Sequence, residues 1–129
     1  NFYLTMKKLS HKRDELRVVA DQFGVATSNQ FIAEKIKIII PQLSKENTGV
    51  YHLVPDGSCS WYAFAKQIIS QTNKEFNLEN FYPIETHEFP TKTIRPKNSI
   101  LNNAKIKHKF NLDLNDWQDC LSKIISEEK

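Results

Sequence analysis

Glycine is scarce in this chain, and its spacing limits the folds and ligand loops that the chain can form. The 129 residues contain three glycines, Gly24, Gly49 and Gly57, and the closest two are eight positions apart. A loop that wraps a phosphate needs several glycines in one tight turn, because its backbone N–H groups must approach the anion. The sequence contains neither a dinucleotide-binding fingerprint nor a P-loop. We therefore expect that the chain binds no dinucleotide by itself.

The overall composition is that of an ordinary soluble domain. Hydrophobic residues make up 40% and charged residues 26% of the chain, which argues against wholesale disorder. A length of 129 residues fits one domain, and we expect residues 1–129 to form it. The longest apolar run, Ile38–Ile40, is far shorter than the ~20 residues of a membrane helix, and a net charge of +3 is weak support for nucleic-acid binding. We therefore expect neither a membrane nor a nucleic acid as a partner.

The cysteines and histidines form neither a disulfide framework nor a metal site in the sequence. Cys59 and Cys120 are interpreted as two reduced, packed thiols, which predicts a cytoplasmic protein. The four histidines show no metal-ligand spacing with each other or with the cysteines. No metal-binding residue is predicted.

Hydrophobic periodicity predicts an α/β domain that is rich in helices and has few short strands. The expected elements are a helix from Phe2, a strand at 16–19, a helix from Thr27 or Ser28 to Pro41, a strand at 50–54, a helix from Ser58 or Ser60 to about Gln71, an extended segment at 83–86, a short helix from Ser99 to about Lys109 and a last helix from Asn115 or Asp116. The residues expected to point inward from the second helix are Phe31, Ile32, Ile36, Ile39 and Ile40. Those of the third helix are Trp61, Phe64, Ala65, Ile68 and Ile69.

The loop after the strand at 16–19 carries the first candidate ligand contacts. Loops at strand ends often carry such contacts, because the rigid scaffold aims their side chains. Gln22 and Thr27 offer neutral donors and acceptors that suit sugar hydroxyls or a base edge. Gly24 is expected to supply a backbone φ that other residues resist. The structural alternative is that Asp21 and Gln22 only tie the loop to the following helix.

Arg95 stands in an Arg-Pro-Lys-Asn-Ser segment that carries the second set of candidate contacts. Its planar guanidinium matches the oxygens of a pyrophosphate or a carboxylate. Asn98 and Ser99 are expected to cap the following helix while they face the same cleft. The alternative is an ion pair between Arg95 and Asp21 or Glu85 that only ties the loop down.

Tyr62 and Lys66 match the Tyr-x-x-x-Lys pair of short-chain dehydrogenases. Residues four apart share a helix face, and a lysine ammonium there stabilises the ionised tyrosine that general acid work requires. A two-residue match is common by chance, however, and hydride transfer also needs a cofactor pocket that this chain cannot form. We therefore assign the pair a structural role and predict no catalytic residue in the chain.

Three segments, in this order and spacing, resemble one known family. They are Val18–Thr27, Ser58–Lys66 and Arg95–Leu101. Together they are similar to the C-terminal half of dTDP-4-dehydrorhamnose reductases, which are members of the extended short-chain dehydrogenase/reductase superfamily. The chain departs from the family pattern at Ala26, where the family has proline, and at Ile100, where it has arginine. The resemblance covers nearly the whole chain.

The resemblance implies a fold and a role. It implies the helix-rich substrate-binding portion of a longer reductase, whose missing N-terminal Rossmann half would hold NADPH or NADH. We interpret the chain as a C-terminal fragment because it begins without an initiator methionine. The intact enzyme would reduce the 4-keto group of dTDP-4-dehydro-L-rhamnose, and the fragment alone would bind no cofactor and be inactive. Gln22, Thr27, Arg95 and Asn98 would contact the dTDP-linked sugar.

Three other interpretations stay open. A related nucleotide-sugar epimerase or reductase would share this half almost unchanged. A non-catalytic regulatory homologue would look the same in this region. A module that binds single-stranded nucleic acid is the third alternative. An oligomer is compatible with each of them.

Overall fold

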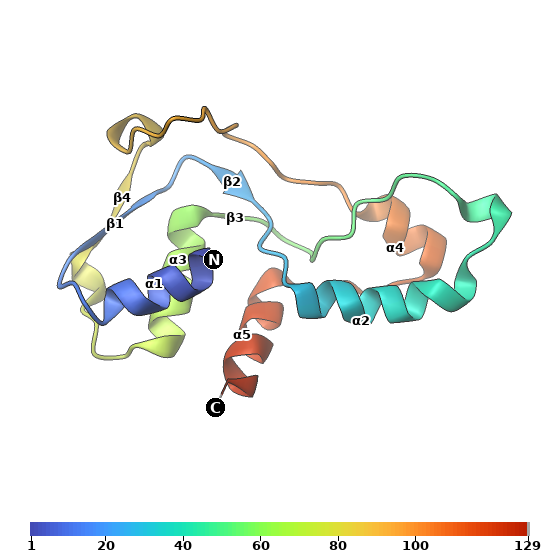
Figure 1. Ribbon diagram of the computed structural model, residues 1–129, viewed down its shortest axis with the longest axis horizontal. Coiled ribbons are helices and arrows are strands. Elements are labelled where there is room, and N and C mark those ends of the chain that lie inside the picture. The colour runs from blue at the N-terminus through green and yellow to red at the C-terminus, as the bar shows by residue number, and fades with distance from the viewer. Residues whose placement is uncertain (129) are drawn as a thin grey trace.

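Five α-helices and two small sheets make up the part of the chain that the structure describes, residues 1–128. In this computed structural model, helices alternate with short strands (Figure 1). The helices are α1 (Phe2–Ser10), α2 (Asn29–Ile39), α3 (Trp61–Thr72), α4 (Ala104–Phe110) and α5 (Trp117–Glu127), and the strands are β1 (Leu16–Val19), β2 (Phe23–Gly24), β3 (Cys59–Ser60) and β4 (Phe81–Ile84). Four 3-10 turns join them: η1 (Ile40–Gln42), η2 (Lys45–Asn47), η3 (Leu78–Asn80) and η4 (Thr86–Glu88). The predicted class, a helix-rich α/β chain with few short strands, is confirmed.

A parallel pair of strands, β1 and β4, contributes Leu16, Val18 and Phe81 to the main core. Leu16 pairs with Phe81, and the register continues to the end of both strands. Leu16 and Val18 are buried while Arg17 between them is exposed, so β1 has one apolar face and one solvated face. Parallel strands need a long crossover connection, and the connection between these two contains α3, which packs against β1.

Three helices, α1, α3 and α5, pack together around that core. Ala65, Ile68 and Ile69 of α3 are fully buried, as the periodicity predicts. They join Met6 of α1 and Leu121 of α5 in one cluster, so residues from both ends of the chain contribute to it. No helix within residues 1–128 has the length and apolar character needed to cross a membrane.

Side-chain caps fix where four of the helices begin, and for α2, α3 and α5 the sequence offered two candidate residues. In each of these three helices the second candidate is the cap. Ser28 Oγ accepts a hydrogen bond from the backbone N–H three residues later (3.0 Å), and Ser60 Oγ does the same (3.1 Å). Asp116 caps α5 in a similar way, through its Oδ1 (2.9 Å). These local bonds explain why the sequence located the helix starts well.

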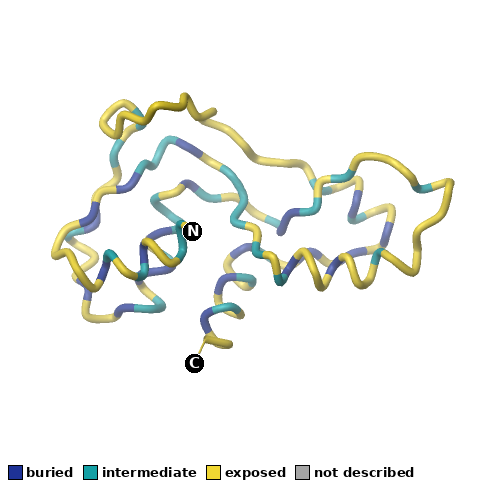
Figure 2. Tube along the Cα trace, viewed as in Figure 1, coloured by how far each residue is buried: buried dark blue, intermediate teal, exposed yellow. Residues whose placement is uncertain are grey.

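A second, smaller core lies between α2 and α4. Its buried members are Phe31, Ile106, Phe110, Leu112 and Leu114. The prediction that Ile32, Ile36 and Ile40 point inward is wrong, since these side chains are 36%, 41% and 60% exposed. Figure 2 shows the alternation of buried and exposed positions along this helix. Only the face of α2 that carries Phe31 and Lys35 is covered by other parts of the described chain.

The strand predicted at residues 50–54 is also wrong for the described chain. The segment is neither helix nor strand, because no other strand within residues 1–128 pairs with it. Tyr51 and Leu53 nevertheless pack against the second core, whereas Val50 and His52 are exposed. The alternation typical of a strand is therefore present without a partner strand.

The helix predicted from Ser99 begins later, at Ala104. Asn98 does not cap it. Its Oδ1 accepts a hydrogen bond from the backbone N–H of Ile100 (2.9 Å), which closes a local turn. This turn, and the pairing of the preceding residues with Phe23, hold the chain out of a helical conformation up to α4.

Gly57 has a backbone conformation that other residues resist. Its φ is +79°, and a Cβ there would lie 2.5 Å from Asp116 Oδ2 and 3.0 Å from Trp117 Cδ1. The expectation of such a φ at Gly24 is wrong. A Cβ on Gly24 would meet only ordinary contacts, with Ser99 Cβ at 3.9 Å. The turn at Gly57 therefore depends on glycine, and the turn at Gly24 does not.

Gly57→Ala is expected to lower the free energy of unfolding by about 1–3 kcal/mol, because alanine must adopt a left-handed φ and its Cβ meets Asp116. The matched control is Gly24→Ala, which should change this free energy by less than about 1 kcal/mol. Urea denaturation followed by circular dichroism measures both variants. Equal midpoints would contradict this account of the turn.

Asp56 is expected to make stability depend on acidic pH. Its carboxylate accepts hydrogen bonds from Lys107 Nζ (2.7 Å) and Asn103 Nδ2 (2.9 Å), which lower its pKa below the ordinary value of 3.8. The resulting stabilisation is present above the unfolded pKa and is lost as the pH falls through the lower folded pKa. Asp56→Asn should therefore flatten the loss of stability below about pH 4. The control is Asp14→Asn, at an exposed position, which should lose stability below about pH 4 as the parent does. Thermal melts over a range of acidic pH measure both variants. An Asp56→Asn curve that matches the parent curve would refute the assignment.

Candidate functional site

The two predicted ligand-contacting segments lie side by side because the backbone of Phe23 joins them. The Phe23 N–H donates to the Lys97 carbonyl, and the Phe23 carbonyl accepts from the Ser99 N–H, both at 2.8 Å. On its opposite edge, β2 pairs antiparallel with β3, which leads directly into α3. We name the segment 95–99 the strap. The loop that contains Gln22 therefore lies between the start of α3 and the strap.

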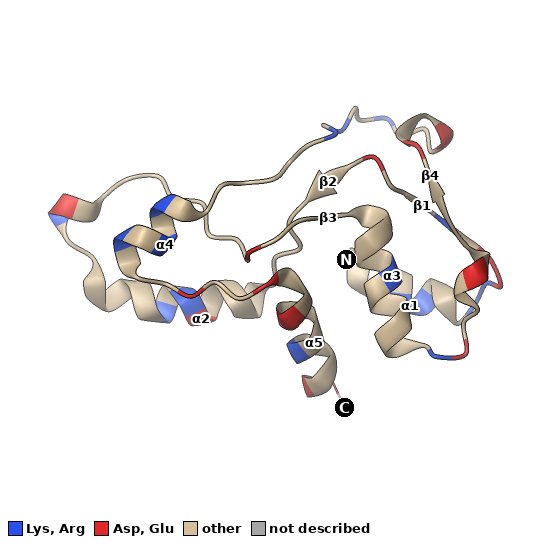
Figure 3. Cartoon of the chain, turned by 180° about the vertical axis from the view of Figure 1, so that it is seen from behind, with Lys and Arg blue, Asp and Glu red and all other residues tan. Residues whose placement is uncertain are grey.

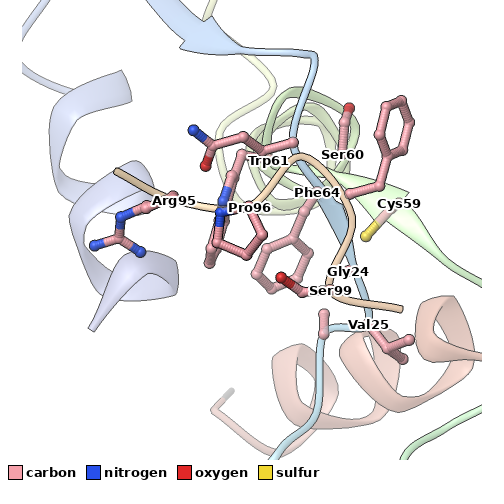
Figure 4. Close-up of a pocket in the computed structure, with 12 residues that line it drawn as sticks. Gly24, Val25, Cys59, Ser60, Trp61, Phe64, Arg95, Pro96 and Ser99 are labelled. Carbon is pink, nitrogen blue, oxygen red and sulfur yellow. The ribbon is translucent and has the colours of Figure 1, made fainter. Parts of the chain in front are cut away.

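A pocket of about 240 Å³ opens where these three segments meet (Figure 4). It is lined by Gln22, Phe23, Gly24, Val25, Ala26, Cys59, Ser60, Trp61, Phe64, Arg95, Pro96 and Ser99. In the view of Figure 4, the Arg95 guanidinium lies at one end of this group and the Cys59 thiol at the other. The structure thus brings two of the four predicted contacts, Gln22 and Arg95, into one concavity.

The Arg95 guanidinium has no carboxylate partner and makes no hydrogen bond within residues 1–128. The alternative ion pairs with Asp21 or Glu85 do not form. Asp21 pairs instead with Lys97 (3.2 Å), and Glu85 lies 3.3 Å from the ring of His87. Figure 3 shows the basic residues along the strap segment. The donors of Arg95 are therefore available to an anionic ligand.

Asp21 and Gln22 anchor the loop to η4. The backbone N–H and the hydroxyl of Thr86 donate to Asp21 Oδ1, at 2.9 and 2.6 Å, and Gln22 Nε2 donates to Thr86 Oγ1 (3.1 Å). The Thr86 hydroxyl, with the Lys97 ammonium, lowers the pKa of Asp21. Gln22 is buried and also lines the pocket. Asp21 and Gln22 therefore do tie their loop down, as the structural alternative predicts. Their bonds lead to η4, however, and not to the following helix.

Thr27 and Asn98 lie outside the pocket that holds Arg95. Thr27 lines a neighbouring pocket of about 660 Å³ between α1, α5 and the loop before α2. The two pockets share walls formed by Val25, Ala26, Trp61 and Phe64. Asn98 is exposed, and its side chain is engaged in the turn with Ile100.

An aromatic wall is the part of the site that sequence reasoning missed. Trp61 and Phe64 were assigned to the inward stripe of α3, but both line the pocket, and Trp61 is 36% exposed. Phe2 packs on Trp61 with a ring-centroid distance of 4.6 Å, and Trp117 packs on Phe64 at 5.9 Å. These contacts hold the wall in place. Periodicity within one helix does not reveal which of its apolar side chains border a cavity.

Cys59 lines the pocket, whereas the Tyr62–Lys66 pair lies outside it. Burial raises the pKa of the Cys59 thiol to about 11, which keeps it protonated near neutral pH. Tyr62 stacks on Phe81 and donates to the Phe81 carbonyl (3.3 Å), while Lys66 is exposed, and neither lines the pocket. The structural role predicted for this pair fits these contacts.

The glycines of residues 1–128 do not form the turn of a dinucleotide-binding loop. Gly24 lies in β2, Gly49 follows η2 and Gly57 lies in the turn before β3, so no single turn collects them. Within residues 1–128, no three His, Cys, Asp or Glu side chains gather as metal ligands would.

Comparison with known proteins identifies the relatives of this chain. The RmlD substrate binding domain family matches residues 1–129. A dTDP-4-dehydrorhamnose reductase of Burkholderia thailandensis is 33% identical over 129 residues, which cover 92% of this chain and 43% of the relative. The enzyme of the same name from Escherichia coli (strain K12) is 35% identical over 132 residues, which cover 98% of this chain and 44% of the relative. The chain spans less than half the length of these curated relatives.

A solved structure shows the same fold. The dTDP-4-dehydrorhamnose reductase from Bacillus anthracis, crystallised in complex with NADP, matches with a TM-score of 0.86 at 35% identity. The match covers 98% of this chain and 43% of that chain. The resemblance seen in the sequence is confirmed, and the chain belongs to the RmlD substrate binding domain family.

Proposed function

We propose that residues 1–129 form the substrate-binding domain of a dTDP-4-dehydrorhamnose reductase and hold a dTDP-linked sugar beside a cofactor bound elsewhere in the intact protein. That protein would reduce the 4-keto group of dTDP-4-dehydro-L-rhamnose with NADPH or NADH. The names of the relatives and the NADP in the Bacillus anthracis structure support this assignment. An N-terminal Rossmann half would bind the cofactor, and the dispersed glycines of this chain support that division of roles.

The observation that carries the proposal is the Arg95 guanidinium, which has no partner within residues 1–128 and lies beside an aromatic wall. A diphosphate supplies the anionic oxygens that a planar guanidinium fork binds. A deoxysugar or a thymine ring supplies apolar faces that pack on side chains such as Trp61 and Phe64. A dTDP-linked sugar joins both chemistries in one molecule.

The pocket is too small to enclose a whole nucleotide-sugar. Its volume of 240 Å³ is below the roughly 300–1,000 Å³ of typical small-molecule sites. The adjoining pocket at Thr27 extends the surface, but both are open. A second wall from the rest of the intact enzyme would complete the site.

This chain contributes positioning to the reaction. Arg95 would grip the diphosphate, Gln22 and Thr27 would offer hydrogen-bonding groups along the groove, and Asn98 would act through the turn that orients the strap. Holding a ketone in reactive geometry near a hydride donor removes about 7 kcal/mol or more of the barrier. No residue of this chain is needed to move a proton in that role.

Arg95→Ala is expected to weaken binding of dTDP to the chain by about tenfold or more, because a charge-assisted hydrogen bond contributes about 1.5–3 kcal/mol. The matched control is Lys92→Ala, which removes a positive charge three residues away and outside the pocket. Isothermal titration calorimetry measures both affinities. Equal weakening by the two variants would reduce the role of Arg95 to general electrostatic attraction.

The full-length enzyme is expected to oxidise NADPH or NADH with dTDP-4-dehydro-L-rhamnose, and Arg95→Ala should lower its kcat/KM by about tenfold or more. Absorbance of the nicotinamide measures the rate, and the 129-residue chain alone should show none. Faster turnover of a different nucleotide-ketosugar would assign a related reductase or epimerase instead. A folded protein that turns over none of these sugars would be the regulatory homologue.

A further inference from the structure

A series of hydrogen bonds runs from Asp21 through Thr86 to Gln22 at the edge of the pocket. Thr86 Oγ1 donates to Asp21 Oδ1 (2.6 Å), and Gln22 Nε2 donates to Thr86 Oγ1 (3.1 Å). The Thr86 backbone N–H also donates to Asp21 Oδ1 (2.9 Å), and Lys97 Nζ lies 3.2 Å from Asp21 Oδ2. We name the side chains of Asp21, Thr86 and Gln22 the relay. It joins the loop before β2 to η4, two segments that are remote in the chain.

The direction of each bond in the relay follows from the charge of Asp21. The Thr86 hydroxyl, with the Lys97 ammonium, lowers the pKa of Asp21, so this side chain is an ionised carboxylate near neutral pH. A carboxylate only accepts hydrogen bonds. The one hydroxyl proton of Thr86 must therefore point to Asp21, and Thr86 Oγ1 can only accept from Gln22. Because the NH2 group is the only donor of a side-chain amide, Nε2 of Gln22 must face Thr86.

The other end of the Gln22 amide, Oε1, is left to accept from a ligand. Within residues 1–128 this atom makes no hydrogen bond, and no fully enclosed side-chain N or O atom there lacks a partner, so Oε1 keeps access to solvent. Gln22 as a whole is only 8% exposed, and it lines the pocket with Arg95 and Trp61 (Figure 4). The Trp61 backbone N–H donates to the Gln22 carbonyl (3.3 Å), which holds the residue beside the aromatic wall. The pocket therefore contains an acceptor whose direction the relay fixes.

A fixed acceptor selects ligands in a way that the other polar groups of the pocket do not. The Arg95 guanidinium only donates, and the hydroxyls of Ser60 and Ser99 can turn either to donate or to accept. A ligand that places its own acceptor against Gln22 Oε1 would leave both groups unpaired. Sites that are built to bond a polar ligand group discriminate strongly against analogues that lack it, for this reason.

We propose that Gln22 is a specificity-determining residue, whose Oε1 accepts a hydrogen bond from an N–H or O–H group of the ligand, and that Asp21 and Thr86 are positioning residues that fix its direction. This inference rests on the proposed function, under which the ligand is a dTDP-linked sugar. Such a ligand carries donors in two places, the imide N–H of thymine and the hydroxyls of the sugar. Both present the same chemistry to Gln22.

Nuclear magnetic resonance tests the relay without any ligand. In the 129-residue chain, the side-chain amide protons of Gln22 should show a nuclear Overhauser effect to the Thr86 methyl group. They should also exchange with water at least about tenfold more slowly than those of Gln118, whose side chain is exposed. Gln22 amide protons that exchange as fast as those of Gln118 and show no contact with Thr86 would overturn the relay.

A substitution of Thr86 tests the effect on ligand choice. Thr86→Val removes the hydroxyl and keeps the shape of the side chain, so the Gln22 amide is no longer held in one direction. Thr86→Ser is the matched control, because it keeps the hydroxyl. Isothermal titration calorimetry of the full-length enzyme measures the affinities for dTDP, for dTDP methylated at N3 of thymine and for dTDP-L-rhamnose.

The measured quantities are two preferences, that for dTDP over its N3-methylated form and that for dTDP-L-rhamnose over dTDP. Thr86→Val should reduce one of them by about threefold to tenfold, the fold-change of one neutral hydrogen bond, and Thr86→Ser should retain both. A fall in the first preference assigns the donor to the thymine imide. A fall in the second assigns it to a sugar hydroxyl.

Two outcomes separate this inference from the proposed function. If Thr86→Val keeps both preferences of the parent, the specificity role of Gln22 is wrong, even where the variant is less stable, because a purely structural tie does not alter ligand choice. A full-length enzyme that binds none of the three compounds would sink the proposed function and the ligand role together. The exchange of the Gln22 amide would then still decide the relay.

Discussion

The candidate site is held together by the backbone of Phe23. Its N–H and carbonyl both bond to the strap, while the opposite edge of β2 pairs with β3. These bonds join three segments that are far apart in the chain, and they use main-chain groups that every non-proline residue has. The start of α3, the Gln22 loop and the strap therefore form one surface. The nearly half-exposed side chain of Phe23 adds to the pocket wall but is not what connects these segments.

The charges around this junction are divided between structure and binding. Asp21 is bonded to Thr86 and to Lys97, so the carboxylate that contacts the strap is already paired. Its lowered pKa reflects those same partners. Arg95, on the same strap as Lys97, is left with its donors free within residues 1–128. Lys97 of the strap thus holds the loop, and Arg95 is available to an anion.

The pocket is an incomplete surface. It has an aromatic wall and the Arg95 guanidinium, which has no partner within residues 1–128, but it is open and small for a nucleotide-sugar. In the proposed intact enzyme, the other half of the protein would supply the second wall of this pocket. The ligand would then lie between the two halves.

The sequence by itself determined the features that depend on short-range chemistry. The caps at Ser28, Ser60 and Asp116 and the buried face of α3 follow from bonds and periodicity within one element, which composition and spacing encode. Only the tertiary structure decided that Arg95 and Gln22 line one pocket, that Trp61 lines it too and that Ile36 of α2 is exposed. Strand pairing and burial depend on partners that are remote in the chain. A local pattern of residues predicts that a surface is apolar, but it does not predict which part of the protein covers that surface.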